Sequence, residues 1–110
     1  MTDAYIIDAA RTPRGIGKAG KGSLSEFHPG RLLAKVFAGI QERNDLRTEE
    51  IDDVVVGCSS QVDKQGSCVG RMAALDAGWS TKASAVTLDR FCGSGITSVN
   101  LAAANIMSGM

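Results

Sequence analysis

Apolar and polar positions follow one another along the chain in blocks that predict alternating strands and helices. Residues 4–9 (AYIIDA) form a short apolar run before an Arg-Thr-Pro turn, and we expect a first strand there. Residues 54–56 (VVV) are β-branched and apolar, which is typical of a buried parallel strand. Residues 85–88 (AVTL) form a third run of the same kind. The pattern therefore predicts three short strands.

Three other stretches have the spacing of helices. Pro29 suits a first helical turn, and apolar side chains then follow at spacings of one, three and four as far as Arg43. Residues 67–76 have a similar pattern, which Gly78 stops. Residues 95–107 (GITSVNLAAANIM) are small and apolar nearly all round. We expect this last helix to be buried.

Strands that alternate with helices indicate an α/β fold with a mostly parallel sheet covered by helices. The chain has 110 residues, of which 44% are hydrophobic and 22% charged, as in an ordinary globular domain. A helix that is apolar on all sides needs covering layers that this length barely supplies. We therefore expect residues 1–110 to be an incomplete part of a larger domain.

Charge and cysteine content narrow the function classes. Twelve Lys and Arg balance twelve Asp and Glu, so no net field attracts nucleic acid or an acidic membrane. The apolar runs are shorter than a membrane span, and Asp3 and Asp8 do not fit a secretory signal. Three cysteines without a closely spaced pair favour free thiols in a reducing compartment. We expect a cytoplasmic protein with neither nucleic acid nor membrane as partner.

Cys92 is the candidate catalytic residue. It lies between the strand at 85–88 and the helix that starts near Gly95. The positive end of a helix dipole favours a thiolate, which is the attacking species. Gly93 and Gly95 leave the sulfur uncrowded, so that an acyl thioester could approach it. Free cysteine is also among the most buried residue types, and these features alone leave a structural cysteine as the alternative.

The remaining reactive side chains favour structural roles. Cys58 and Cys68 lack the spacing of a zinc site and are expected to fill space, and we expect no bound metal. His28 precedes Pro29, where a capping or surface role is favoured over catalysis.

The glycine-rich stretch at residues 15–20 spells G-x-G-x-x-G and nearly continues as a P-loop. Gly22 replaces the Ser or Thr of that motif, and no helix starts before Pro29. Backbone amides therefore cannot converge on a phosphate at a helix end, which argues against nucleotide binding.

Four segments, in order, resemble the N-terminal part of the thiolase family. They are an opening strand with its Arg-Thr-Pro turn (residues 7–15), a second strand (51–57), the helix before the nucleophile (70–78) and the nucleophile segment VTLDRFCGSG (86–95). Two departures leave the subfamily open. Asp89 stands where thiolases commonly have Asn, and residues 68–71 (CVGR) replace a common Asn-x-Ala-Arg.

The resemblance implies an acyl-CoA C-acyltransferase with a thiolase-like layered fold, of which residues 1–110 are the first part of the N-terminal domain. In the implied ping-pong reaction the Cys92 thiolate takes an acyl group from acyl-CoA and passes it to CoA or to an acetyl-CoA enolate. The outcome is 3-ketoacyl-CoA thiolysis or acetoacetyl-CoA formation. CoA and acyl-CoA are then substrates, with no permanently bound cofactor, and a homodimer or homotetramer is implied.

The same resemblance implies that a second cysteine and His and Asn groups, in motifs downstream of residue 110, complete the chemistry. We therefore expect residues 1–110 alone to be inactive. CoA-binding residues, acyl-chain length and reaction direction are left unassigned. The alternative is a non-catalytic thiolase relative that binds acyl-CoA or a lipid.

Overall fold

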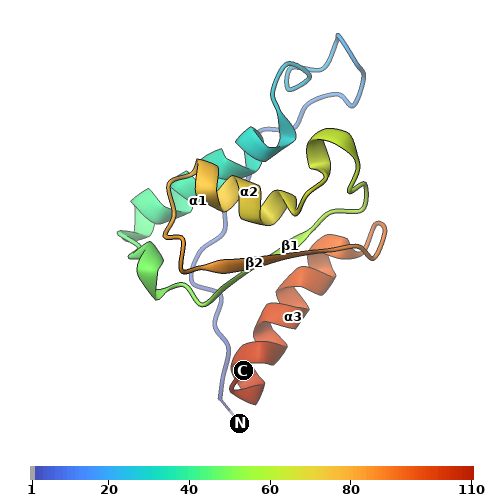
Figure 1. Cartoon of the computed structure of the whole chain (residues 1–110). Coiled ribbons are helices and arrows are strands. Elements are labelled where there is room, and N and C mark those ends of the chain that lie inside the picture. The colour runs from blue at the N-terminus through green and yellow to red at the C-terminus, as the bar shows by residue number, and fades with distance from the viewer. Residues whose placement is uncertain (1) are drawn as a thin grey trace.

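The computed structural model describes residues 2–110 as a small parallel sheet with helices on both faces (Figure 1). The regular elements are α1 (Pro29–Asn44), β1 (Asp53–Gly57), α2 (Val69–Asp76), β2 (Ser84–Leu88) and α3 (Ser94–Ser108), with single 3₁₀ turns at Thr48–Glu50 and Asp63–Gln65. Five of the six elements expected from the sequence are therefore present at the expected places.

β1 and β2 are parallel neighbours, and α2 is the crossover between them. The register runs from Asp53 opposite Ser84 to Gly57 opposite Leu88. One more backbone bond, from Cys58 N–H to the Leu88 carbonyl at 2.9 Å, extends the ladder past both strands. The carboxyl ends of the two strands thus lie at one edge, where ligands bind in open α/β sheets.

The helices form layers on the sheet. α2 packs on one face with α1 outside it, while α3 packs against β1 on the other face (Figure 1). Gly70 allows the close contact of α2, because a Cβ there would lie 2.8 Å from Val56 Cγ2. The Gly70 N–H donates to Thr87 Oγ1 at 3.2 Å, so a side chain of β2 binds a free amide at the start of α2.

The core lies between β1, α2 and α1. Val54, Ala74, Trp79 and Ala83 are buried together, and Phe37 of α1 packs against them. The rings of Trp79 and Phe37 stack with centroids 4.8 Å apart and an interplanar angle of 25°.

His28 has the capping role expected for it. Its Nδ1 accepts a hydrogen bond from Gly30 N–H at 3.1 Å, and Pro29 occupies the first turn of α1. The only histidine of the sequence is thus the N-cap of α1.

The expected strand at residues 4–9 is wrong. These residues are extended without pairing, and Tyr5, Ile6 and Ile7 are 79%, 83% and 87% exposed. An apolar run becomes a strand only when a neighbour pairs its backbone groups, and within residues 2–110 neither β1 nor β2 does so. Asp8 instead ties the segment to the end of α1 through Arg43 and Asn44.

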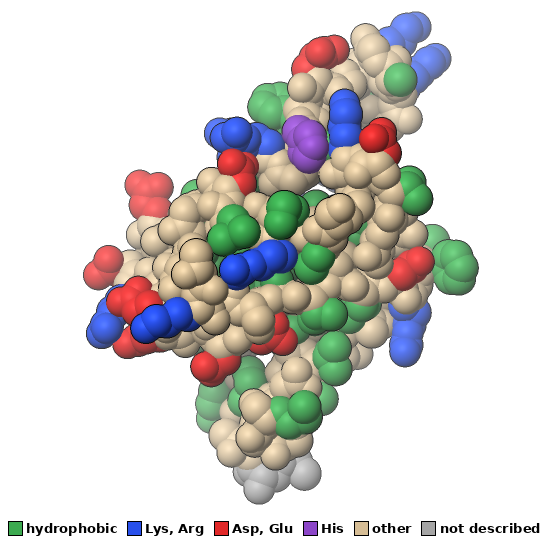
Figure 2. All heavy atoms as spheres, in the orientation of Figure 1, with side chains coloured by type: hydrophobic (Ala, Val, Ile, Leu, Met, Phe, Trp, Pro, Cys, Tyr) green, Lys and Arg blue, Asp and Glu red, His purple; other side chains and the backbone are tan. Residues whose placement is uncertain are grey.

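The expected burial of the last helix is not observed either. Only Ser94 and Ser98 of α3 are buried, and Ile96 and Val99 are 72% and 56% exposed. Figure 2 shows apolar side chains at the surface over the lower part of the molecule, where α3 lies. The reason is that β1 contacts one side of the helix while its other sides meet no layer of the described chain. No helix in residues 2–110 combines the length and the hydropathy that a membrane crossing requires.

Candidate active site

Cys92 lies in the turn that joins β2 to α3, at the carboxyl edge of the parallel sheet. Its side chain is exposed, and no other residue from 2 to 110 forms a hydrogen bond with its sulfur. Gly93 is the N-cap residue of α3, so Cys92 directly precedes the cap of a 15-residue helix. The sequence-based placement of Cys92 between a strand and a helix start is confirmed.

The backbone of this turn is strained at the residue before Cys92. Phe91 has φ of 46°, in the left-handed region, and its side chain is 80% exposed. That conformation costs a non-glycine residue roughly 1–2 kcal/mol. Such a conformation persists only where surrounding contacts hold it. Asp45, Asp63, Ser67 and Cys68 also have a positive φ, so the conformation alone does not mark a functional site.

Two side chains bind the backbone on either side of the strained residue. The Phe91 N–H donates to Asp89 Oδ1 at 2.8 Å. Ser94 Oγ accepts from Arg90 N–H at 2.8 Å and donates to the Phe91 carbonyl at 2.7 Å. Ser94 is only 5% exposed, so both bonds are shielded from water. Asp89 and Ser94 therefore hold the backbone of the turn, and the Cys92 sulfur contributes none of the hydrogen bonds that hold it.

Gly57 seats this turn on the end of β1. A Cβ at Gly57 would lie 2.4 Å from both the carbonyl carbon and oxygen of Ser94. No side chain fits there, so the first turn of α3 contacts the strand backbone directly. The position of Cys92 relative to the sheet edge follows from this contact.

The other two cysteines are half-buried and make local contacts. Cys58 follows β1, and its sulfur lies 3.7 Å from Gln65 Nε2. Cys68 Sγ lies 3.3 Å from Thr87 Oγ1 at the start of α2. All three thiols are free. The structure thus gives Cys58 and Cys68 the packed surroundings expected of structural residues and leaves Cys92 exposed.

The glycine-rich stretch does not lead into a helix. The N–H groups of Lys21 and Gly22 both donate to the Lys18 carbonyl, closing a turn, and α1 starts only at Pro29. The glycine-rich stretch therefore has no helix N-terminus directly after it that could bind a phosphate. Residues 2–110 also contain no group of three acidic, Cys or His side chains able to bind a metal.

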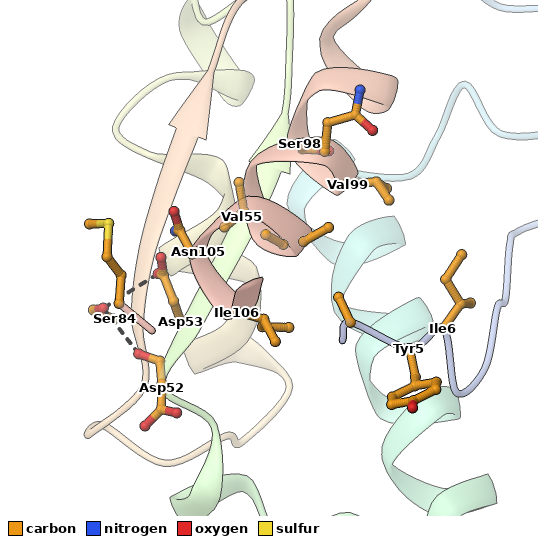
Figure 3. Close-up of a pocket in the computed structure, with 15 residues that line it drawn as sticks. Tyr5, Ile6, Asp52, Asp53, Val55, Ser84, Ser98, Val99, Asn105 and Ile106 are labelled. Carbon is orange, nitrogen blue, oxygen red and sulfur yellow. Dashed lines mark hydrogen bonds between the residues drawn. The ribbon is translucent and has the colours of Figure 1, made fainter. Parts of the chain in front are cut away.

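A hollow in the described chain lies away from Cys92. A cavity of about 850 Å³ separates the N-terminal segment from β1 and α3, with Tyr5, Ile6 and Ile106 among its apolar lining (Figure 3). Cys92 is not among its lining residues. The cavity therefore reflects the uncovered side of α3 and is separate from the candidate active site.

The roles of Asp89 and Ser94 were missed by the sequence reasoning, which noted Asp89 only as a departure from Asn. A signal was present, because Asp89 and Phe91 have the i, i+2 spacing at which an Asp side chain accepts a bond from the backbone. For Ser94, the sequence shows no signal beyond its place near a helix start.

Comparisons with known proteins give a consistent result. The family model described as "Thiolase, N-terminal domain" matches residues 4–110. A steroid 3-ketoacyl-CoA thiolase of Mycobacterium tuberculosis is 39% identical over 109 residues, which cover 99% of this chain and 26% of that protein. A 3-ketoacyl-CoA thiolase of Shewanella loihica is 40% identical over 111 residues, covering 100% of this chain and 28% of that protein.

The fold has a solved counterpart. The crystal structure of the Bacillus anthracis acetyl-CoA acetyltransferase superposes with a TM-score of 0.73 at 30% identity, covering 80% of this chain and 22% of that one. The chain thus spans about a quarter of the length of the proteins that it matches.

Proposed function

The chain belongs to the thiolase family, and from this premise we propose that the protein is an acyl-CoA C-acyltransferase with Cys92 as its nucleophile. The observation that carries the proposal is the Cys92 turn itself. An exposed thiol stands at the carboxyl edge of a parallel sheet, directly before a long helix, in a turn held by other side chains. Cys68 also has a left-handed backbone but is half-buried, so the exposure of the Cys92 thiol in its held turn, and not strain alone, supports the proposal.

The chemistry follows from the exposed sulfur. The Cys92 thiolate attacks the acyl carbon of an acyl-CoA, a thioester forms on the enzyme, and the CoA thiolate leaves. In a second step the acyl group passes to the enolate of acetyl-CoA, which forms a carbon–carbon bond and releases Cys92. In the reverse direction the Cys92 thiolate attacks the keto carbon of a 3-ketoacyl-CoA, and the carbon–carbon bond breaks. Acetyl-CoA leaves as its enolate and is protonated, and the thiolate of CoA then takes the acyl group from Cys92. The relatives named 3-ketoacyl-CoA thiolases support the cleavage direction, and the solved counterpart named acetyl-CoA acetyltransferase supports acetyl-CoA as a substrate.

The proton of Cys92 has to be taken by a base that residues 2–110 do not place in contact with it. The one histidine, His28, is engaged by Gly30 N–H at the start of α1. We propose that the base, the second cysteine and the oxyanion-binding groups lie in sequence beyond residue 110. On this proposal residues 1–110 form the first part of the N-terminal domain, inactive alone, and the greater length of the relatives supports it.

We propose that CoA and acyl-CoA bind as substrates without a resident cofactor, and that the protein works as a homodimer or homotetramer. Three free cysteines and no disulfide in the described chain support a reducing, cytoplasmic location.

The test is covalent labelling of the protein in its full natural length. After incubation with acetyl-CoA, we expect mass spectrometry of digested peptides to find an acetyl group on Cys92. The matched variants Cys58→Ser and Cys68→Ser should keep the adduct, and Cys92→Ser should lose it. Tight binding of acyl-CoA without any adduct would support the non-catalytic alternative, and an adduct that persists in Cys92→Ser would exclude Cys92 as the nucleophile.

A further inference from the structure

We infer that Asp89 and Ser94 are positioning residues for Cys92, which hold the strained Phe91 backbone and so fix the direction of the cysteine sulfur. The inference rests on the proposed role of Cys92 as the nucleophile. It adds two residues that act on the reaction through the Cys92 turn without touching the substrate.

Ser94 holds the turn from inside the fold. Its hydroxyl group binds the backbone at Arg90 N–H (2.8 Å) and at the Phe91 carbonyl (2.7 Å), both of which precede Cys92. The side chain is 5% exposed, so water does not readily replace these bonds when the hydroxyl is removed. The loss of the Ser94 hydroxyl would leave the Arg90 N–H without its side-chain partner, and the Phe91 carbonyl would keep only the Ser94 N–H, at 3.1 Å.

Asp89 holds the turn from the solvent side. Its carboxylate accepts the Phe91 N–H at 2.8 Å, while the Phe91 φ of 46° keeps that residue in the left-handed region. An Asn side chain has an oxygen in the same place and can accept the same bond. Asn at position 89 should therefore preserve the turn, and Ala should not.

The residues after Cys92 are fixed as well. The Gly93 N–H donates to the Arg90 carbonyl at 2.9 Å, and the Gly93 carbonyl accepts from Thr97 N–H at 3.0 Å. Ser94 in turn is seated on Gly57. The backbone is thus held on both sides of Cys92, and its sulfur stays free for an acyl group.

Ser98 provides a matched control. It lies one helical turn further along the same face of α3, is 8% exposed, and donates its hydroxyl to the Gly95 carbonyl at 2.8 Å. Ser98→Ala removes a buried helix hydroxyl just as Ser94→Ala does, without touching the Cys92 turn. A loss of activity caused by weakened packing should appear in both variants. A loss caused by misplacement of Cys92 should appear only in Ser94→Ala.

The experiment compares Ser94→Ala, Asp89→Ala, Asp89→Asn and Ser98→Ala in the full-length protein. The readouts are the rate of Cys92 modification by iodoacetamide at one pH, the rate of acetyl transfer from acetyl-CoA to Cys92, and kcat and KM. Misplacement of a reacting group by about 1 Å costs roughly 100-fold in rate. We expect Ser94→Ala and Asp89→Ala to lower kcat and acetyl transfer by about 10- to 100-fold, with KM changed less than about twofold.

The controls decide between positioning and structure. Asp89→Asn and Ser98→Ala should keep acetyl transfer within about twofold of the natural protein. Equal losses in Ser98→Ala and Ser94→Ala, or no loss in Asp89→Ala, would overturn the positioning role. Absence of a Cys92 adduct in the natural protein would instead refute the proposed function, so the two failures are distinguishable.

Discussion

Phe91 is the residue whose backbone conformation suits it least. A bulky side chain at φ of 46° is strained, yet the ring is 80% exposed and gains little packing in return. The sequence predicted where Cys92 lies, because a strand, a glycine pair and a helix surround it. It could not predict the Phe91 conformation, since Phe is not a residue that signals a left-handed backbone.

The stability of variants at position 91 should therefore depend on how well the new residue tolerates a left-handed backbone. Asn tolerates the left-handed region, so Phe91→Asn should leave the free energy of unfolding unchanged or raise it by up to about 1 kcal/mol. Val is β-branched and tolerates the left-handed region poorly, so Phe91→Val should lower that free energy by about 1–2 kcal/mol. Urea denaturation measures both.

A control for these variants is Phe27, which is also partly exposed, at 45%, and has no positive φ. The same two substitutions at Phe27 should not show the order seen at Phe91. If Phe91→Val is as stable as Phe91→Asn, the left-handed backbone is not a source of strain.

At the scale of elements, the contact between β1 and α3 depends on one missing side chain. A Cβ at Gly57 would lie 2.4 Å from the Ser94 backbone, and backbone atoms cannot rotate away as a side-chain tip can. We expect Gly57→Ala to move α3 off the strand and to lower the free energy of unfolding by about 2 kcal/mol or more. Thermal or urea unfolding provides the measurement.

Gly39 is the matched control for Gly57. It lies within α1, and a Cβ there would meet nothing within 4 Å. Gly39→Ala should therefore stabilise the protein by roughly 0.5–1 kcal/mol, because alanine is the better helix former. A Gly57→Ala variant as stable as Gly39→Ala would show that α3 is not tightly seated on β1.

The sequence pattern predicted α1, β1, α2, β2 and α3 because each has a clear apolar period and a start or stop residue such as Pro29 or Gly78. The expected strand at residues 4–9 failed because strand formation depends on a partner that local sequence does not specify. The burial expected for α3 failed for a related reason. An apolar surface such as that of Ile96 shows that a helix can be covered, and it does not show what covers it.

On the scale of the whole molecule, the α/β layering and the thiolase resemblance expected from the sequence are confirmed. The N-terminal segment joins these layers through Asp8. Hydrogen bonds from Asn44, from the Ala9 N–H and from Arg43, together with the positive charge of Arg43, hold the pKa of Asp8 below its ordinary value of 3.8. This contact between distant parts of the chain was not visible in the sequence, because 35 residues separate Asp8 from Arg43.

The Asp8 tether should release on acidification. Because its pKa is lowered in the fold, the stabilisation is present above the ordinary value of 3.8 and is lost as the pH falls through the lower folded value. We expect NMR contacts (nuclear Overhauser effects) between Asp8 and the Asn44 side chain to disappear there, while those between β1 and β2 remain as internal reference. Asp8→Ala should show the released state already at neutral pH, and a pH-dependent release that persists in Asp8→Ala would assign the effect to another group.

The stacked pair of Trp79 and Phe37 gives this chain a built-in optical probe. Trp79 is the single tryptophan of residues 1–110 and is only 9% exposed, so the tryptophan fluorescence of this part of the protein comes from one site between α1 and α2. The Cys92 turn lies at the sheet edge, outside that stack. An unchanged wavelength of maximum emission in a variant of the Cys92 turn would therefore indicate an intact core. A red shift would indicate that water has reached the Trp79 indole.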